Sequence, residues 1–395
     1  MNQHLLFKHL LTIGGAVLLA ACGADNDKDN TVSIKEGSYV VQMNKEVAAG
    51  NLIGDRTPTQ GLLTTVGTDY ALSSYQSTLY HLGRFGVDRM TRYDQELDKD
   101  KAIWDFSAND ANSPSNSNPY ELVQNADDNA YLIRYGATTI WQVDPSATQE
   151  VDFIKATIDL SDYNATGATT PRMAGAVIEN NTLFVMLQRL DITWAPQTPY
   201  LVAIDLSTHQ EIDTNPQQDG LKGIPLNTPN PFSIEAHNGY LYVSGHGPYN
   251  SSEAGGIDKI DASTYQVTNL INKDTLSYLS IPSEDIYPHI QDIAVVRGNK
   301  AYTLIHREKG RKTLSSTLQE LNPETGKLRA PLTLPELTGK QLRDIAVGPN
   351  DRLWVSVHDA ADPKLLVIDT DTNTLADTID LNSTAIDIDF LVIDR

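Results

Sequence analysis

The stretch "LYVSGH", residues Leu241–His246, carries the pattern that decides the fold of this chain. An apolar residue precedes an aromatic one, three residues follow, and the sixth position varies. A short run of this kind, rich in β-branched and aromatic residues and bounded by turn residues, predicts a β-strand. The pattern returns in the same form as "LYHLGR" (Leu79–Arg84), "AYLIRY" (Ala130–Tyr135), "LFVMLQ" (Leu183–Gln188), "AYTLIH" (Ala301–His306) and "LWVSVH" (Leu353–His358).

A second motif follows the first along the chain and ends another strand with Asp or Asn before a turn. An Asp or Asn side chain there bonds the backbone two residues on and closes an Asx-type turn. Successive turn residues are separated by roughly 47–61 residues, and fixed-order repeats of this size with about four strands each are typical of a β-propeller. The motif appears as "VDPSAT" from Val143, "IDLSTH" from Ile204, "IDASTY" from Ile260, "LNPETG" from Leu321 and "IDTDTN" from Ile368.

The sequence therefore predicts an all-β fold, a seven-bladed β-propeller over residues 37–395. Full units occupy about 67–381 and supply six blades. The C-terminal "STAIDIDFLVIDR", 383–395, resembles a first strand, and Ser38–Met43 fits the second-strand template with "GLLTTV", 61–66, as a later strand. We therefore expect a seventh, composite blade that closes the ring without a disulfide. Eight blades are the alternative if residues 107–125 or 211–228 contain further strands.

The N-terminal residues predict where the protein is targeted in the cell. Residues 1–21 read as a secretory signal peptide, because their apolar run is shorter than the roughly 20 residues that a membrane span needs. Leu19–Cys22 resembles the lipobox of bacterial lipoproteins, in which the cysteine takes a diacylglycerol, and Cys22 is the sole cysteine of the chain. An ordinary signal peptide with an incidental cysteine is the alternative. Residues 22–36 are polar and predict a flexible tether.

These features predict a lipid-anchored protein of the cell envelope. In proteobacterial lipoproteins, an Asp after the lipidated cysteine resembles a signal for retention in the inner membrane. Here Gly23 follows Cys22, so the resemblance favours the outer membrane. The net charge of −21 argues against nucleic acid or an anionic lipid surface as the main partner. The expected partners are the membrane, through the anchor, together with a small-molecule ligand and an outer-membrane transporter or another envelope protein.

No motif of a known catalytic site is present. The chain has no Gly-x-Ser-x-Gly, no HExxH and no phosphate-binding loop, so we predict no catalytic residue and no cofactor. The segment "DTDTNTLADTID" from Asp369 lacks the glycine and the final glutamate of a calcium loop and coincides with the repeated turn, so we predict no metal. An enzyme whose site is assembled from scattered loops remains an alternative.

The candidate binding residues come from the sixth template position, where the second strand of each blade ends beside the central channel, and from the loops and first strands on the same face. Three histidines fall there in adjacent blades, which predicts a cationic, aromatic-edged basin over the last three full blades. His and Arg donate hydrogen bonds to carboxylate, phosphate or catecholate oxygens. Blade-to-blade similarity alone is the competing explanation. The predicted ligand-binding residues are His246, His306, His358, Arg84, Gln188, Arg307, Arg343 and Trp194, with Tyr249 also at the rim and Lys309, Arg311 and Lys312 in the same cationic loop.

From Gly37 to Arg395 the chain resembles the bacterial seven-bladed propellers with YncE-like repeats. With the lipobox it is similar to surface-exposed propeller lipoproteins that capture cobalamin or ferric siderophores for an outer-membrane transporter. The resemblance implies a non-catalytic protein that binds an anionic or metal-chelate ligand. It maps no binding residue. The propeller lipoprotein of the outer-membrane assembly machinery fits less well, because its Trp-bearing repeat is missing. A protein-interaction scaffold and an enzyme of lactonase or quinoprotein type are the alternative functions.

Overall fold

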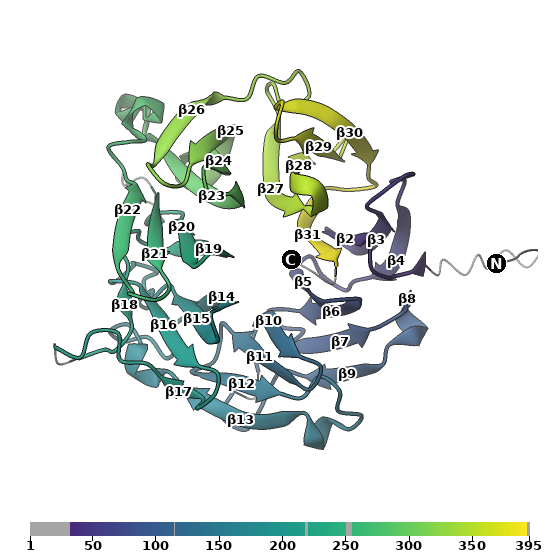
Figure 1. The fold of residues 1–395 in the computed structure, drawn as a ribbon, viewed down its shortest axis with the longest axis vertical. Helices are drawn as coiled ribbons and strands as arrows, with labels where there is room; N and C mark the ends of the chain where they lie inside the picture. Colours follow the sequence, from purple (N-terminus) through teal and green to yellow (C-terminus); the bar gives the residue numbers. More distant parts are fainter. Residues whose placement is uncertain (1–31, 114, 218–219, 250–254, 393–395) are drawn as a thin grey trace, which may run out of the picture.

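A computed structural model describes residues 32–113, 115–217, 220–249 and 255–392. Seven antiparallel sheets are arranged as blades around a central hub (Figure 1). This confirms the seven-bladed β-propeller. The predicted signal peptide and the lipidation site at Cys22 lie outside the described residues. Within the described ranges, no helix has the length and apolarity to cross a membrane.

The strands are numbered in chain order and the blades from the first complete sheet. Blade 1 comprises β5 (Tyr70–Tyr75), β6 (Thr78–Gly83), β7 (Arg89–Tyr93) and β9 (Trp104–Ser107). Blade 2 comprises β10 (Pro119–Ala126), β11 (Asn129–Arg134), β12 (Thr139–Val143) and β13 (Ile154–Asp159). Blade 3 comprises β14 (Met173–Glu179), β15 (Thr182–Leu187), β16 (Tyr200–Asp205) and β17 (Gln210–Glu211), with β18 (Ile224–Pro225) also paired to β16.

Blade 4 comprises β19 (Pro231–His237), β20 (Tyr240–Gly245), β21 (Gly256–Asp261) and β22 (Val267–Ile271). Blade 5 comprises β23 (Ile286–Arg297), β24 (Lys300–Lys309), β25 (Lys312–Asn322) and β26 (Lys327–Pro331). Blade 6 comprises β27 (Gln341–Gly348), β28 (Arg352–His358), β29 (Lys364–Asp369) and β30 (Thr374–Asp380). Short 3-10 turns connect some strands: η1 (Lys99–Lys101), η2 (Glu150–Asp152), η3 (Ser161–Tyr163), η4 (Ser277–Leu279), η5 (Pro282–Glu284) and η6 (Pro349–Asp351).

Blade 7 is the composite blade that the sequence predicted. The C-terminal strand β31 (Ala385–Leu391) pairs with β2 (Ser38–Met43), which continues into β3 (Glu46–Asn51) and β4 (Thr59–Thr64). Outside the ring, β1 (Val32–Ser33) pairs with β8 (Glu96–Leu97). An eighth blade is absent from the described ranges: residues 107–125 contain the first strand of blade 2, and residues 211–228 contain only part of β17 and the two-residue β18, both in the sheet of blade 3.

The hydrophobic core is divided into clusters, one at each interface between neighbouring blades. An isolated four-stranded sheet leaves apolar faces in water, whereas blades stacked in a ring bury them. The aromatic residue at the second template position is buried in every blade, and loss of one such ring from a core typically costs about 3–5 kcal/mol. These residues are Tyr80, Tyr131, Phe184, Tyr242, Tyr302, Trp354 and Tyr39.

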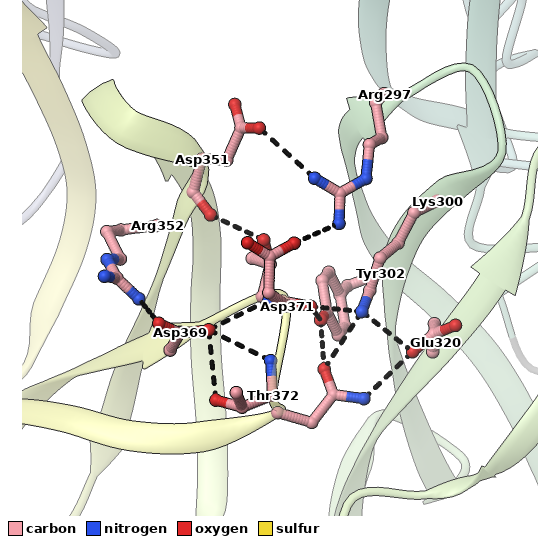
Figure 2. A network of polar contacts seen from close by, with 11 residues as sticks. Arg297, Lys300, Tyr302, Glu320, Asp351, Arg352, Asp369, Asp371 and Thr372 are labelled. Carbon is pink, nitrogen blue, oxygen red and sulfur yellow. Dashed lines mark hydrogen bonds and ion pairs between the residues drawn. The ribbon is translucent and has the colours of Figure 1, made fainter.

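Polar bonds between blades add to this apolar packing. Figure 2 shows such a network between blades 5 and 6, at the end of β24 remote from His306. Within blade 5 the buried Lys300 lies 3.2 Å from the carboxylate of Glu320, and it donates to the carbonyl of Thr370 in blade 6. Tyr302 donates from its hydroxyl to the Asn373 side chain of blade 6. Arg297 reaches Asp371 across the same interface at 2.5 Å. The network joins strand ends of blades 5 and 6 on this face of the propeller. The loops described next lie on the opposite face, where His306 is located.

Candidate functional site

The inner strand of each blade begins where the second strand ends, so both sets of residues meet on one face of the hub. The register shows this directly, since Pro231 pairs with Gly245, His289 with His306 and Gln341 with His358. We call this side of the molecule the rim face. The side chains gathered around the hub on it form the hub rim, which comprises Arg84, Tyr120, Tyr135, Arg172, Trp194 and Tyr249.

Backbone geometry fixes the entry to the inner strands of three successive blades. Asn118, Arg172 and Asn230 each precede an inner strand and have φ of +53°, +62° and +52°. Their carbonyls accept hydrogen bonds from the N–H groups of the sixth template positions, as in the 3.0 Å bond from Gln188 to Arg172. Asparagine tolerates this left-handed region, whereas arginine there is uncommon. Arg172 is therefore held in an unfavourable conformation by its surroundings.

Guanidinium and aromatic groups stack in sequence along the hub rim. The guanidinium of Arg84 lies 3.6 Å from the ring centroid of Tyr120. The rings of Tyr120 and Tyr135 are stacked with centroids 4.9 Å apart, and the guanidinium of Arg172 lies 5.4 Å from the ring centroid of Tyr135. Burial raises the pKa of both tyrosines, and Tyr249 acts on both in the same direction. Cation–π contacts of this kind strengthen as water is excluded.

The guanidinium of Arg172 has a second aromatic neighbour, Trp194, whose ring centroid is 4.6 Å away. Trp194 is 44% exposed and has a φ of +65°, which makes it a genuine outlier for a bulky residue. The carboxylate of Asp191 holds the loop, accepting from the backbone N–H groups of Thr193 at 2.7 Å and of Ala195 at 3.0 Å. Among the described residues, the buried Nε of Arg172 has no hydrogen-bond partner. Strained residues of this kind concentrate at functional sites.

Gln188 holds Tyr135 of the hub rim in position through hydrogen bonds. Its side chain is buried, accepts from the Tyr135 hydroxyl at 2.7 Å and donates to the carbonyl of Pro231 at 3.0 Å. Both ends of the amide are thereby committed to protein groups. Gln188 therefore fixes the orientation of Tyr135 and links blade 3 to blade 4.

Two of the three predicted histidines meet around a carboxylate that the sequence did not single out. His246 Nε2 lies 3.3 Å from one oxygen of Glu308, and His306 Nδ1 lies 3.7 Å from the other. The ring of His289 stacks on that of His246 with centroids 4.3 Å apart. We call these four residues the histidine cluster. In the described part of the chain, no group of three or more His, Cys, Asp or Glu side chains is placed to hold a metal ion.

Burial and the neighbouring side chains shift the pKa values of His289 and Glu308 in the histidine cluster. Burial lowers the pKa of His289 to about 4, with a further contribution from the neighbouring His246. Burial also acts to raise the pKa of Glu308, but the neighbouring imidazoles of His246 and His306 outweigh it and hold that pKa below its usual value. His306 Nε2 also lies 2.9 Å from the carbonyl of Leu342, which fixes its ring against blade 6. The cluster therefore combines a carboxylate with imidazole donors at the edge of the hub.

The remaining predicted residues lie apart from these contacts. His358 and Arg343 are exposed on blade 6, and Arg307 donates from Nε to the carbonyl of Leu279 at 3.0 Å. The cationic segment after His306 was expected to be a loop, but β24 continues through it to Lys309 and turns tightly into β25. From this segment Arg311 lies 5.1 Å from the ring centroid of Tyr249 and so joins the hub rim. The aromatic contacts are thus centred on blades 1–4 rather than on the last three full blades.

Sequence reasoning missed Tyr120, Arg172 and Glu308. The repeats were aligned on their second strands, whereas Tyr120 and Arg172 belong to the entry of the first. An alignment on the inner strands places Arg172 at the same position as Asn118 and Asn230 in "NPY" and "NPF". Glu308 gave no comparable signal, because it lies within a run of basic residues.

Comparisons with known proteins find a similar fold but no related sequence or family. No protein-family model matches the chain, and no curated protein matches its sequence. The fold is similar to that of the periplasmic gluconolactonase PpgL from Pseudomonas aeruginosa, with 10% identity and a TM-score of 0.59 over 90% of this chain and 99% of that one. A putative 6-phosphogluconolactonase from Bacteroides uniformis gives 12% identity and a TM-score of 0.58 over 89% and 98%. A Lactobacillus plantarum protein gives 15% identity and 0.58 over 90% and 99%. At such identities the likeness shows a shared fold alone.

Proposed function

We propose that this chain is a non-catalytic binding protein that captures a small anionic ligand, such as a metal chelate with anionic oxygens, on the hub rim. The observation that carries the proposal is the geometry of Arg172. Its guanidinium contacts two aromatic rings, its backbone has a left-handed φ, and its buried Nε lacks a hydrogen-bond partner among the described residues.

An anionic ligand supplies what this arrangement lacks. A buried donor without an acceptor costs about 1–3 kcal/mol. Because Nε has almost no exposed surface, an anionic oxygen recovers that cost when the Arg172 side chain shifts toward the ligand. Arg84 adds a second guanidinium on the same stack, paired with Asp69 at 3.2 Å. Because the whole protein has a net charge of −21, the clustered cations locally reverse the repulsion that an anion otherwise meets.

The cellular part of the proposal rests on the sequence. Lipid at Cys22 anchors the protein in the outer membrane, and the part of the predicted tether that precedes β1 gives the propeller reach from the bilayer. An outer-membrane transporter is the proposed recipient of the ligand. Substitution of Cys22 by Ser tests the anchor, because the protein should then appear in the soluble fraction; a Cys22→Ser protein that stays in the membrane contradicts it.

Tryptophan fluorescence tests the ligand. Trp194 is exposed, whereas Trp104, Trp141 and Trp354 are buried, so quenching by a ligand on the hub rim reports mainly on Trp194. We expect ferric tris-catecholate or ferric citrate to quench the purified protein in a saturable manner. Arg172→Ala should weaken binding by about 10–100-fold, since hydrogen bonds to charged groups contribute about 1.5–3 kcal/mol.

The matched control is Arg329→Ala, which removes an exposed arginine that pairs with Glu320 on blade 5. This variant should bind as the unmodified protein does. Trp194→Phe should abolish the fluorescence response and thereby assign it. The proposal fails if neither chelate quenches the protein, or if the Arg172→Ala and Arg329→Ala variants bind equally well.

A further inference from the structure

A groove of about 600 Å³ lies on the rim face between blades 3 and 4. Its walls are the β15–β16 loop, the residues between β18 and β19, the end of β22, and Pro248 and Gly255 from the connection between β20 and β21. It shares no lining residue with the stacked part of the hub rim. A ligand in this groove would therefore be distinct from one on the hub rim. The side chains used below are Gln197, Thr198, Asn227, Thr228, Asn269 and Lys273.

A fully buried carboxylate organises one wall of the groove. Asp258 on β21 accepts hydrogen bonds from the backbone N–H groups of Asn227 at 2.7 Å and Thr228 at 2.8 Å. It also accepts from the side-chain amide of Asn269 at 2.8 Å. Burying a carboxylate costs free energy unless it is hydrogen-bonded, and its bonds in turn orient the groups that donate to it. Here it orients two asparagines of the groove.

These bonds determine what the wall presents to a ligand. Asn269 and Asn227 both use their amide nitrogens to bond Asp258, so their side-chain oxygens are the acceptors available at the groove. Gln197 uses its side-chain oxygen to accept from the backbone of Thr166 at 3.2 Å, which leaves its amide nitrogen as a donor. The hydroxyl of Thr198 serves as either. The side chains that line the groove thus offer both donors and acceptors.

Prolines and one closely packed glycine restrict the backbone in the rest of the groove. Four lining residues are prolines, which fix φ and lack an N–H. A Cβ on Gly256 would lie 2.5 Å from the carbonyl oxygen of Ile271, so the floor requires glycine there. A rigid wall loses little entropy when a ligand binds.

Charge narrows the ligand class. Lys273 is the sole ionisable side chain that lines the groove within the described residues, and it is exposed to solvent. The Asp258 carboxylate is covered by its N–H donors, so the other polar side chains of the described lining are uncharged amides and hydroxyls. We infer that the groove binds a neutral, hydroxyl-rich ligand, a short oligosaccharide. A sugar hydroxyl both donates and accepts, and it therefore pairs with amide groups that present each function. The four prolines add apolar surface, which suits the C–H faces of the sugar.

An extended peptide fits the same groove less well. Peptides that bind along a protein surface as strands need backbone donors and acceptors at a sheet edge. The loop walls supply Pro196, Pro199, Pro229 and Pro248 instead, none of which has an N–H. Side chains rather than backbone therefore dominate recognition here.

The experiment uses the purified protein and three neutral probes, maltotriose, cellotriose and tri-N-acetylchitotriose, with binding measured by calorimetry and by saturation-transfer NMR. We expect at least one trisaccharide to bind. The Gln197→Ala/Asn269→Ala double variant should weaken that binding by about tenfold or more, because it removes one donor and one acceptor. Thr198→Trp should block the groove by bulk.

The controls separate this site from the hub rim. Asn112→Ala, an exposed amide in the connection between β9 and β10, should leave trisaccharide binding unchanged, and so should Arg172→Ala. Thermal unfolding of each variant checks that it is folded. Absence of binding by all three probes, or equal binding by the double variant and Asn112→Ala, overturns the proposal. Loss of binding in both Arg172→Ala and Asn112→Ala also overturns it, because the ligand then lies elsewhere.

Discussion

The Oδ2 atom of Asp387 accepts a hydrogen bond from the backbone N–H of Leu72 at 2.7 Å. Asp387 lies on the C-terminal strand β31, and Leu72 lies on the inner strand of blade 1, so this bond joins the two ends of the propeller ring. The arrangement recurs around the hub. Glu121 of blade 2 bonds the N–H of Ala176 in blade 3, and Glu235 of blade 4 bonds that of Val295 in blade 5.

Asp387→Ala should destabilise the protein by about 1–3 kcal/mol, because it leaves the N–H of Leu72 without an acceptor at a buried interface. Urea unfolding measures the change. Asp380→Ala, an exposed carboxylate at the end of β30, is the matched control and should change stability by less than about 0.5 kcal/mol. Equal effects of the two substitutions would show that the hub bond does not contribute to ring closure.

The hub carboxyls also make stability depend on pH. Burial raises the pKa of Asp387 and of Glu121 to about 7 from their usual values of 3.8 and 4.5. A raised folded-state pKa means that the folded protein holds protons which the unfolded chain has released. The stability contributed by these groups is therefore fully present below about pH 4 and is lost as the pH rises through 7.

Asp387→Asn should consequently lessen the loss of stability between pH 5 and pH 8, by up to about 1 kcal/mol per pH unit. The amide still offers an oxygen to Leu72, which distinguishes this substitution from Asp387→Ala. Urea unfolding at the two pH values, with the exposed Asp162→Asn as control, measures the slope. A slope unchanged by Asp387→Asn contradicts a raised pKa in the folded state.

Local repeats explain how much of this molecule the sequence predicts. The aromatic at the second template position and the Asx turn each recur within one blade, so the seven-bladed ring and its composite closure follow from short patterns. The hub rim depends on contacts between blades. Arg172 meets Tyr135 and Trp194 because three segments from two blades converge, and no single repeat records that convergence.

The histidine cluster gives an opposite pH dependence. Although burial acts to raise it, the neighbouring imidazoles of His246 and His306 hold the pKa of Glu308 below its usual value of 4.5, so the stability it contributes is present above that pH and is lost as the pH falls further. Glu308→Gln should therefore cost about 1–3 kcal/mol at pH 7 and much less at pH 3, measured by urea unfolding. Glu324→Gln, an exposed residue in a turn of the same blade, is the control. A cost independent of pH would assign Glu308 a purely steric role.

Trp194→Gly separates stability from ligand binding. The left-handed φ of +65° is unfavourable for tryptophan and accessible to glycine, and the indole is 44% exposed, so little burial is lost. We expect the melting temperature to stay constant or to rise, by the equivalent of up to about 1 kcal/mol. Calorimetric titration, which needs no fluorescent reporter, should show affinity for the anionic chelates falling by about tenfold. Ile192→Gly, in the same loop and 72% exposed, is the matched control and should retain affinity. If Trp194→Gly instead lowers stability and leaves affinity intact, the strained indole supports the loop and takes no part in binding.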